Sequence, residues 1–404
     1  MNRLARVMAT AIATCCVAQL GVATPASAAE PALGAVFNNA DHWAISKRVS
    51  EMILAAPAGS AIRAAMFRVK GDDPYIISAL QTALGRGVKV KIVVDQSDDN
   101  PNPLADPALA GLNEKIRLRM GVSNNPANDS YMVVCNSGCI GDHVMHSKFF
   151  LFSTMGSKKE VAFISTSNSD RQSATAWQAA YSVAGAPTFY GGFKSYFEDM
   201  AYKRYNPDYY RTFSEGIYKA YIFPRASSTS SSSDPSTDTI YNILNDNVKC
   251  SGNSSGVRSD TLSNATMIRI AMWGFTRVEV AKKILALAKQ GCRFDIVVND
   301  SAEFPATVRA QLQHANINVD NAMQPLVSGT PTWMHAKYML IDGNYAGAPD
   351  TKIVFFGSHN FTINALRHND ECWVKISSSS IHDQFVENFR TIINSVDNMP
   401  GFHA

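Results

Sequence analysis

Apolar stretches recur in the same order in the two halves of the chain. In the first half, the apolar stretch 61–67 is followed by 76–84, where apolar residues recur at helical spacing, and then by a strand-like run at 91–95. The same order returns in the second half, at 267–273, 278–288 and 295–299. A strand, a helix and a strand in succession favour parallel pairing, because the helix carries the chain back across the sheet. The pattern therefore predicts an α/β fold built twice.

Glycines and aromatic residues extend the repeat. Gly87 and Gly291 follow the two helical segments, and a glycine at this place commonly ends a helix. Two later segments of helical pattern, 189–200 and 381–395, each carry a pair of phenylalanines in the same register. We therefore expect two homologous lobes, each with a mixed, mostly parallel sheet flanked by helices.

A Ser-rich stretch with Pro and no periodicity occupies 226–237 and is typical of a linker. It divides the chain into a first lobe, 29–225, and a second lobe, 238–404. The aromatic and basic segment 202–225 precedes it, and two interpretations stay open for this segment. In the first interpretation the segment lines a substrate groove, and in the second its aromatic rings pack the junction of the lobes.

The N-terminus has the pattern of a secretory signal over 1–28. Arg3 and Arg6 precede an apolar run at 7–22, and Ala-Ser-Ala at 26–28 provides a cleavage site. This run is short for a membrane span, and we find no later segment apolar enough to cross a bilayer. We expect the mature protein to be soluble, secreted and extracellular.

Composition indicates a globular protein, with 46% hydrophobic and 18% charged residues. The chain has 37 basic and 34 acidic residues, and two of the basic residues leave with the signal, so the mature net charge is about +1. Binding to duplex DNA depends on neutralising many phosphates, and this balance offers no broad surface for it. A local basic groove remains compatible with this composition.

Five cysteines remain after the signal. In an oxidising compartment we expect disulfides, pairing Cys135 with Cys139 and Cys250 with Cys292. Cys372 lies in an apolar stretch and is predicted to be a buried free thiol. A zinc site is the competing interpretation, but the Cys-x3-Cys spacing lacks a second ligand pair at useful spacing.

Two short motifs, one in each half, combine a histidine, a lysine and a downstream asparagine. The His and Lys are two residues apart, so on a strand they point to the same face. Imidazole, ammonium and amide groups supplied twice are suited to gripping a phosphate and attacking its phosphorus. The motif residues are His146, Lys148 and Asn168 in the first half, and His335, Lys337 and Asn360 in the second.

This pairing resembles the phospholipase D superfamily, whose motif reads His-x-Lys, four residues, Asp, then Gly-Ser-x-Asn. The second copy matches at every position, including Asp342 and Ser358. In the first copy Ser153 stands in place of the Asp, and Ser165 and Thr166 stand for Gly and Ser. We interpret Asp342 as a structural hydrogen-bond partner. Ser358 either binds phosphate or shapes the turn.

The resemblance implies that both lobes bring their motifs to one cleft at a pseudo-twofold axis. One histidine attacks phosphorus and forms a phosphohistidine, and the other protonates the leaving alcohol and then activates water or a second alcohol. The resemblance implies no metal and no other cofactor, because Lys148, Lys337, Asn168 and Asn360 carry the charge of the phosphate.

Which histidine attacks is predicted from the residues that orient the rings. The family commonly places a carboxylate where Glu371 stands in the second lobe, and the first lobe has Gln178 there. A carboxylate favours a charged imidazole, whereas an amide orients the ring without adding charge. We therefore predict that His146 is the nucleophile, kept neutral by Gln178, and that His335 is the acid, kept charged by Glu371.

Three functions remain open from the sequence. The first is a phospholipase D that cleaves head groups at a membrane or micelle interface, with transfer to alcohols as an alternative to hydrolysis. Export, near-neutral charge and apolar residues near the motifs favour it, namely 131–134 and 333–334. Those segments are equally compatible with core strands. A monomer suffices, because both halves of the site lie in one chain.

The second function is an extracellular, metal-independent endonuclease acting on nucleic acid, favoured by local similarity to the small bacterial endonuclease branch after His335. It requires a basic groove, for which the visible residues are Lys70, Arg86, Lys89, Lys91, Lys158 and Lys159. The third is a catalytically weakened binding protein, suggested by the departures in the first motif. His143, three residues before His146, either lines the cleft or faces solvent.

Overall fold

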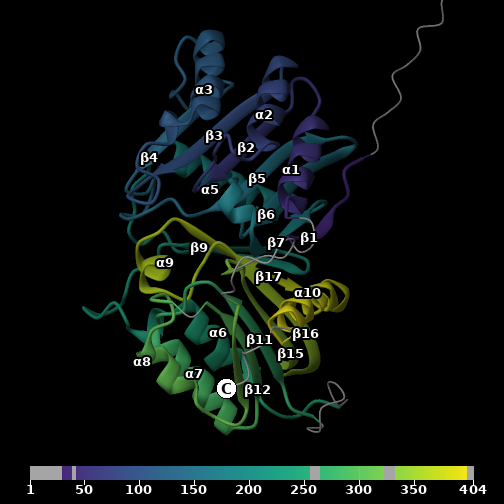
Figure 1. Cartoon of the computed structure of the whole chain (residues 1–404), viewed down its shortest axis with the longest axis vertical. Coiled ribbons are helices and arrows are strands. Elements are labelled where there is room, and N and C mark those ends of the chain that lie inside the picture. The colour runs from purple at the N-terminus through teal and green to yellow at the C-terminus, as the bar shows by residue number, and fades with distance from the viewer. Residues whose placement is uncertain (1–29, 39–41, 255–263, 300, 323–332, 398–404) are drawn as a thin grey trace, which may run out of the picture.

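The computed structural model describes residues 30–38, 42–254, 264–299, 301–322 and 333–397. The predicted signal segment lies outside these residues. Two lobes lie one above the other along the long axis of the molecule, the first half of the chain forming the upper lobe in Figure 1. Each lobe contains one twisted sheet with helices against it.

The first sheet has eight strands among the described residues, seven of them in one path. In spatial order the path is β1 (Gly34–Asn38), β7 (Ala176–Val183), β6 (Lys158–Ser165), β5 (Lys148–Met155), β2 (Ala61–Met66), β3 (Lys89–Gln96) and β4 (Tyr131–Asn136). The eighth, β14 (Trp333–Met334), comes from the second half of the chain and pairs with β7.

In the described part of the chain the second sheet has nine strands, eight of them in one path. In spatial order the path is β13 (Ile317–Asn321), β12 (Arg293–Val298), β11 (Met267–Met272), β15 (Lys337–Tyr345), β16 (Ala348–Gly357), β17 (Glu371–Ser377), β9 (Tyr218–Phe223) and β8 (Arg211–Glu215). A short strand, β10 (Val248–Lys249), pairs with β15.

The two sheets have the same topology, which confirms the duplication. The order β4-β3-β2-β5-β6-β7 in the first corresponds strand by strand to β13-β12-β11-β15-β16-β17 in the second. The sheets are mixed, as expected, but they are not mostly parallel. Only the first three strands of each series pair in parallel, and the pairs that follow are antiparallel. The reason is that short turns join β5 to β6 and β15 to β16, and a short turn allows only antiparallel pairing.

Helices cover the outer face of each sheet and fill the space between the sheets. On the outer faces lie α1 (Ala44–Leu54), α2 (Ile76–Gly85) and α3 (Pro107–Met120) of the first lobe, and α6 (Thr239–Asn247), α7 (Val278–Lys289) and the short α8 (Ala306–Arg309) of the second. Two long helices, α5 (Pro187–Ala201) and α10 (Ser379–Asp397), pack against the opposite faces. These are the two closing helices that the repeat predicted. Short elements complete the chain, namely α4 (Arg171–Ala174), α9 (Ile363–Arg367), η1 (Pro103–Ala105), η2 (Pro235–Thr237) and η3 (Ala310–Leu312).

The predicted glycine stops are confirmed. Gly87 and Gly291 follow the last turns of α2 and α7 with φ of +90° and +98°, a left-handed conformation that favours glycine. In both lobes the glycine amide donates to the carbonyl three residues before it, Leu84 or Ala288. The repeat is therefore conserved within this chain down to the backbone hydrogen bonds of a helix end.

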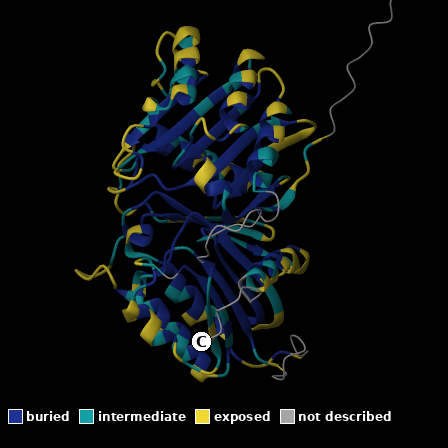
Figure 2. Ribbon diagram, in the orientation of Figure 1, coloured by how far each residue is buried: buried dark blue, intermediate teal, exposed yellow. Residues whose placement is uncertain are grey.

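One apolar core passes through both lobes. Besides a separate core under the outer helices of each lobe, a third cluster joins α5 and α10 to the facing sides of both sheets. Phe37 in β1 of the first lobe, for example, contacts Phe385 in α10 of the second, with ring centroids 5.0 Å apart. Figure 2 shows buried residues continuing across the junction of the lobes. Such continuous burial favours a fixed orientation of the lobes.

The chain passes from one sheet to the other before the predicted linker. The hairpin β8–β9 lies within the predicted first lobe, 29–225, but pairs with β17 in the second sheet. Its aromatic residues Phe213 and Tyr218 contact Phe189 of α5, which favours packing of the junction over the groove interpretation of 202–225. The Ser-rich stretch 226–237 is ordered around Arg367, whose guanidinium donates to several of its carbonyl oxygens.

Both predicted disulfides are present. Cys135 is bonded to Cys139 and Cys250 to Cys292, so these thiols are not zinc ligands, and Cys372 is a buried free cysteine. Within the described part of the chain, no helix combines the length and apolar character needed to cross a membrane.

Candidate active site

Both motif histidines line a single cavity of about 500 Å³ at the junction of the lobes. His146 lies two residues before the start of β5 at Lys148, and His335 lies two residues before the start of β15 at Lys337. These are central strands of the two sheets. The arrangement agrees with the expected cleft between two homologous lobes.

Each histidine is positioned by the opposite lobe. The amide of His335 donates to the carbonyl of Trp177 in β7 (3.2 Å), where β14 extends the first sheet. The amide of His146 donates in turn to the carbonyl of Asp370 in the second lobe (3.1 Å). The two motifs therefore reach their places only when the lobes pack together.

A second pair of equivalent residues fixes the segment before each histidine. The Asp95 carboxylate accepts from the amide of Met145 (2.7 Å), and the Asn299 side chain accepts from the amide of Met334 (2.7 Å). Burial raises the pKa of Asp95 to about 6. Sequence reasoning did not assign these residues a role. The available signal was their shared position, as the last residues of the matching stretches 91–95 and 295–299.

The predicted partners of the histidines are interchanged. Glu371 lies 2.9 Å from Nδ1 of His146, and Gln178 lies 2.7 Å from Nδ1 of His335. The prediction paired each histidine with a residue of its own lobe. It placed Gln178 beside His146 and Glu371 beside His335, and both pairings were wrong. The reason is that β7 and β17 are the strands at the junction, so the residues at their beginnings face the opposite lobe. Distance along the chain gave no indication of this exchange.

The two orienting side chains are themselves held. Glu371 is completely buried, and its Oε1 also accepts from the amide of Asn369 (3.1 Å). The amide of Gln178 lies 2.6 Å from the hydroxyl of Thr166, which accepts from the amide of Ala179 (3.0 Å). Thr166, the residue that replaces the motif serine, thus supports the partner of the second histidine.

The motif lysines have equivalent surroundings. Nζ of Lys148 donates to the carbonyl of His146 (2.5 Å), and Nζ of Lys337 donates to that of His335 (2.7 Å). The aromatic residue at the end of the preceding repeat lies against each lysine. Phe67 lies 5.0 Å from Nζ of Lys148, and Trp273 lies 5.6 Å from Nζ of Lys337. These rings also contact the histidines of their own lobes, at 5.1 and 5.7 Å between centroids.

Burial disfavours positive charge at all four groups. It lowers the pKa of Lys148 to about 7 and that of His146 to about 4, and it holds the pKa of Lys337 well below its usual range. The pKa of His335 is also well below its usual range, first through burial and then through the charges of Lys337 and Lys148. A phosphodiester anion placed among these groups would favour their charged forms.

Of the other motif residues, the two asparagines line the cavity, whereas the serines and Asp342 contact the backbone of neighbouring strands. Asn168 and Asn360 line the cavity, and the Asn360 side chain accepts from the amide of Gly274 (3.3 Å). Ser358 instead exchanges hydrogen bonds with the backbone of Cys372 and is not among the residues that line the cavity, so its contacts are those of a residue that shapes the turn. Asp342 pairs in register with Met267 at the start of β11. Its counterpart Ser153 accepts from the amide of Ala61 at the start of β2 (2.8 Å).

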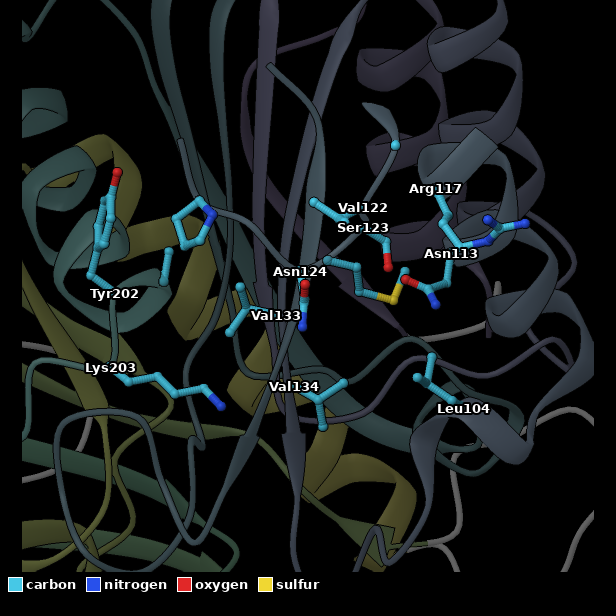
Figure 3. Close-up of a pocket in the computed structure, with 14 residues that line it drawn as sticks. Leu104, Asn113, Arg117, Val122, Ser123, Asn124, Val133, Val134, Tyr202 and Lys203 are labelled. Atoms are coloured by element: carbon cyan, nitrogen blue, oxygen red, sulfur yellow. The ribbon is translucent and has the colours of Figure 1, made fainter. Parts of the chain in front are cut away.

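A second cavity, of about 560 Å³, lies away from the histidines, and Figure 3 shows the side chains that line it. It is bounded by α3, the edge strand β4 and the end of α5. Met132, Val133 and Val134, which were candidates for the mouth of the active site, line this cavity instead. Trp333, the other apolar candidate, does line the catalytic cavity. None of the six basic residues considered for a nuclease groove is among the described residues that line the catalytic cavity.

Comparison with known proteins agrees with this geometry. A family model described as "Cardiolipin synthase, PLD-like domain" matches residues 51–201 and 259–393, one segment in each lobe. A search of curated protein sequences found no significant match.

Two solved structures share the fold at low sequence identity. Phosphatidylserine synthase from Haemophilus influenzae matches with a TM-score of 0.58 and 11% identity, over 89% of this chain and 88% of that one. Polyphosphate kinase from Porphyromonas gingivalis matches with a TM-score of 0.50 and 14% identity, over 87% of this chain. The match covers only 49% of the kinase, so this chain spans about half of that protein. NucT from Helicobacter pylori covers 44% of the chain at 18% identity and a TM-score of 0.31.

Proposed function

The chain belongs to the phospholipase D-like family, whose members act on phosphodiesters, and on this basis we propose that it is a secreted phospholipase D that cleaves the head-group phosphodiester of phospholipids. The observation that carries the chemistry is the placement of His146 and His335 on one cavity, each from a different lobe and each beside its own lysine. We treat secretion as part of the proposal, supported by the N-terminal pattern and the two disulfides.

In the proposed reaction His146 is the nucleophile. Its contact with Glu371 retains a proton on Nδ1 and so leaves the lone pair on Nε2 free to attack phosphorus. The carboxylate also balances the positive charge that the ring acquires in the phosphohistidine. The prediction of His146 as nucleophile is kept, but the reason is the opposite of the one first given, because the carboxylate now supports the attacking ring.

His335 is proposed as the general acid. As Nε2 of His146 forms its bond to phosphorus, the bond to the head-group oxygen breaks, and that oxygen takes the proton from Nε2 of His335. Water then attacks the phosphohistidine and gives its proton to His335, which frees His146 and releases phosphatidate. An alcohol in place of water gives transfer rather than hydrolysis. Lys148, Lys337, Asn168 and Asn360 would carry the negative charge that develops on the phosphoryl oxygens.

Lipid is favoured over nucleic acid by the walls of the cavity. Phe67, Trp273 and Trp333 line it, and aromatic walls suit an amphiphilic substrate. Of the basic side chains, Arg68 lines the cavity, but none of the six considered for a nucleic-acid groove is among the described residues there. Head-group cleavage therefore explains the site better than cleavage of a polyanion.

The test compares both substrates directly. The mature protein, with a chelator present, is incubated with choline-lipid vesicles and, separately, with single-stranded and duplex DNA. We expect choline release without nicking of DNA. DNA cleavage without choline release would replace the proposal with a nuclease.

The histidine variants test the shared site. We expect His146→Ala and His335→Ala each to lower the activity by about 10³-fold or more, because each ring performs a separate proton or phosphoryl step. Thermal unfolding should change little. A variant that retains most of the activity would contradict a site built from both histidines.

A further inference from the structure

Two carboxylates occupy equivalent positions at the mouth of the catalytic cavity. Asp99 follows Asp95 by four residues after β3, and Glu303 follows Asn299 by four residues after β12. Asp95 and Asn299 are the equivalent residues that hold the segments before the two histidines. The pseudo-twofold relation therefore brings one carboxylate from each lobe to the same cavity, and both line it.

The two carboxylates influence each other. The pKa of Glu303 is raised, first by burial and then by the charge of Asp99. The carboxylate of Glu303 lies beside the backbone of Gly274, where an added Cβ would come within 3.2 Å of its Oε2. The same Cβ would lie 3.4 Å from the side chain of Asn360, a proposed phosphate ligand. Glu303 thus adjoins the place of the scissile phosphate.

Among the described residues that line this cavity, no ion pair joins Asp99 or Glu303 to a Lys, Arg or His. The guanidinium that lines the same cavity, Arg68, is bound to Asp170 and to Gln172. His143 also lines the cavity and contacts Asn364. Two neighbouring carboxylates that no ion pair neutralises at a binding site favour a ligand that brings positive charge.

The remaining walls suit an organic cation. Trp273 and Trp333 both contact His335, with ring centroids 5.7 and 5.0 Å from that of the imidazole. Both indoles are partly exposed and line the cavity. Indole faces attract ammonium groups more strongly than other aromatic rings do. A further polar atom, Oδ1 of the 95%-buried Asn168, has no hydrogen-bond partner among the described residues and belongs to the same cavity wall. This orphaned acceptor independently indicates that a ligand completes the site.

We propose that Asp99, Glu303, Trp273 and Trp333 form a subsite for the ammonium group of the leaving head group. The two indoles flank His335, the proposed acid, so the subsite lies on the side from which the alcohol departs. The inference rests on the proposed lipid-cleaving function and narrows its substrates to phospholipids with an ammonium-bearing head group. It also predicts that nucleic acid binds poorly, because the carboxylates repel the phosphates that flank a scissile diester.

The first experiment compares two lipids. Vesicles of phosphatidylcholine and of phosphatidylglycerol are offered to the wild type, to Asp99→Asn, to Glu303→Gln and to the double variant. For the double variant we expect kcat/KM to fall about 10- to 100-fold on the choline lipid, with the value on the glycerol lipid unchanged or increased. Glu387→Gln, an exposed glutamate on α10, removes the same charge elsewhere and should leave both values unchanged.

The second experiment needs no reaction. Tetramethylammonium is titrated into the wild type and the double variant while tryptophan fluorescence is recorded. Saturable binding to the wild type that is lost in the double variant supports the subsite, even if vesicle hydrolysis is absent and the lipase proposal fails. Absence of saturable binding to the wild type, or equal binding to both proteins, overturns the subsite. An equal loss of kcat/KM on the two lipids also overturns it.

Discussion

At the residue scale, function is maintained at a cost in stability. Lys148 and Lys337 are completely buried, and burial lowers the pKa of both. Each ammonium has a carbonyl oxygen and an aromatic face nearby, but no carboxylate is paired with either lysine within the described residues. Buried cationic groups of this kind are common at functional sites, and in the proposed reaction both lysines bind the phosphate.

Replacing a buried lysine should therefore separate stability from activity. We expect Lys148→Met to raise the free energy of unfolding by about 1–3 kcal/mol near neutral pH and to abolish activity. The unfolded chain binds a proton at this lysine below about pH 10.5, whereas the folded chain binds it only below about pH 7. The gain should thus be largest at and below pH 7 and fade as the pH rises toward 10.5.

Urea denaturation across this pH range measures the effect. Lys194→Met, at an exposed lysine of α5, is the matched control and should change stability by less than about 0.5 kcal/mol. A clear loss of stability in Lys148→Met would contradict the claim that the buried lysine destabilises the folded protein.

The side-chain amide of Gln178, which contacts Nδ1 of His335, affects the protonation of that ring. An amide can donate to Nδ1 of His335 or accept from it, whereas a carboxylate only accepts. We expect Gln178→Glu to raise the pKa of His335, because the new negative charge favours the imidazolium. The acid step needs a protonated ring, so the decline of kcat at high pH should move to higher pH by about one unit or more.

The pH profile of kcat distinguishes this positioning role from a structural one. Gln384→Glu adds the same charge on an exposed turn of α10 and should leave the profile unchanged. A profile for Gln178→Glu that is lower at every pH without a shift would indicate only structural damage.

At the scale of elements, the start of β17 connects the disulfide loop to His146, the proposed nucleophile. The Asp370 carboxylate accepts from the amides of Cys139 and Gly141, at 2.7 and 2.6 Å, while its carbonyl accepts from the amide of His146. The loop closed by the Cys135–Cys139 disulfide is thus held against the residue that positions the attacking ring. Loop, strand and nucleophile form one unit across the lobe junction.

Gly141 makes this unit sensitive to a single methyl group. A Cβ at Gly141 would lie 2.0 Å from the carbonyl oxygen of His368 in the other lobe. We expect Gly141→Ala to lower the free energy of unfolding by about 1–3 kcal/mol and to reduce kcat, because the loop must move away from Asp370. Denaturation and vesicle assays measure the two effects.

Gly191 offers a matched control in α5, where an added Cβ meets no atom within 4 Å. Gly191→Ala should be neutral or stabilise the helix by up to about 1 kcal/mol. Equal behaviour of the two variants would show that the contact between Gly141 and His368 does not limit packing.

At the scale of the whole molecule, the duplication places the same residue types at equivalent positions of both lobes, but the partners of the two histidines differ. Both lobes supply a histidine, a lysine and an aromatic ring at equivalent places. The orienting partner differs, however, with a carboxylate at His146 and an amide at His335. In the proposed reaction this difference separates the roles of the two rings, because only His146 has a negative charge nearby to stabilise a phosphorylated form.

Much of this molecule could be predicted from the order of its residues. The repeat of strand, helix and strand predicted two homologous lobes, and the spacing of His and Lys predicted their common face. These features depend on neighbours along the chain and on side-chain periodicity, which the sequence displays directly. The disulfides were predicted on a different ground, namely five cysteines in a chain that is expected to enter an oxidising compartment.

The sequence by itself thus determined the lobes, the motifs and the class of chemistry. Only the tertiary structure decided that Glu371 serves His146, that Gln178 serves His335, and that Asp99 and Glu303 meet at one mouth. These pairings join residues of opposite lobes. They depend on how two sheets are rotated about a shared core, and the side-chain pattern within either lobe carries no information about that rotation.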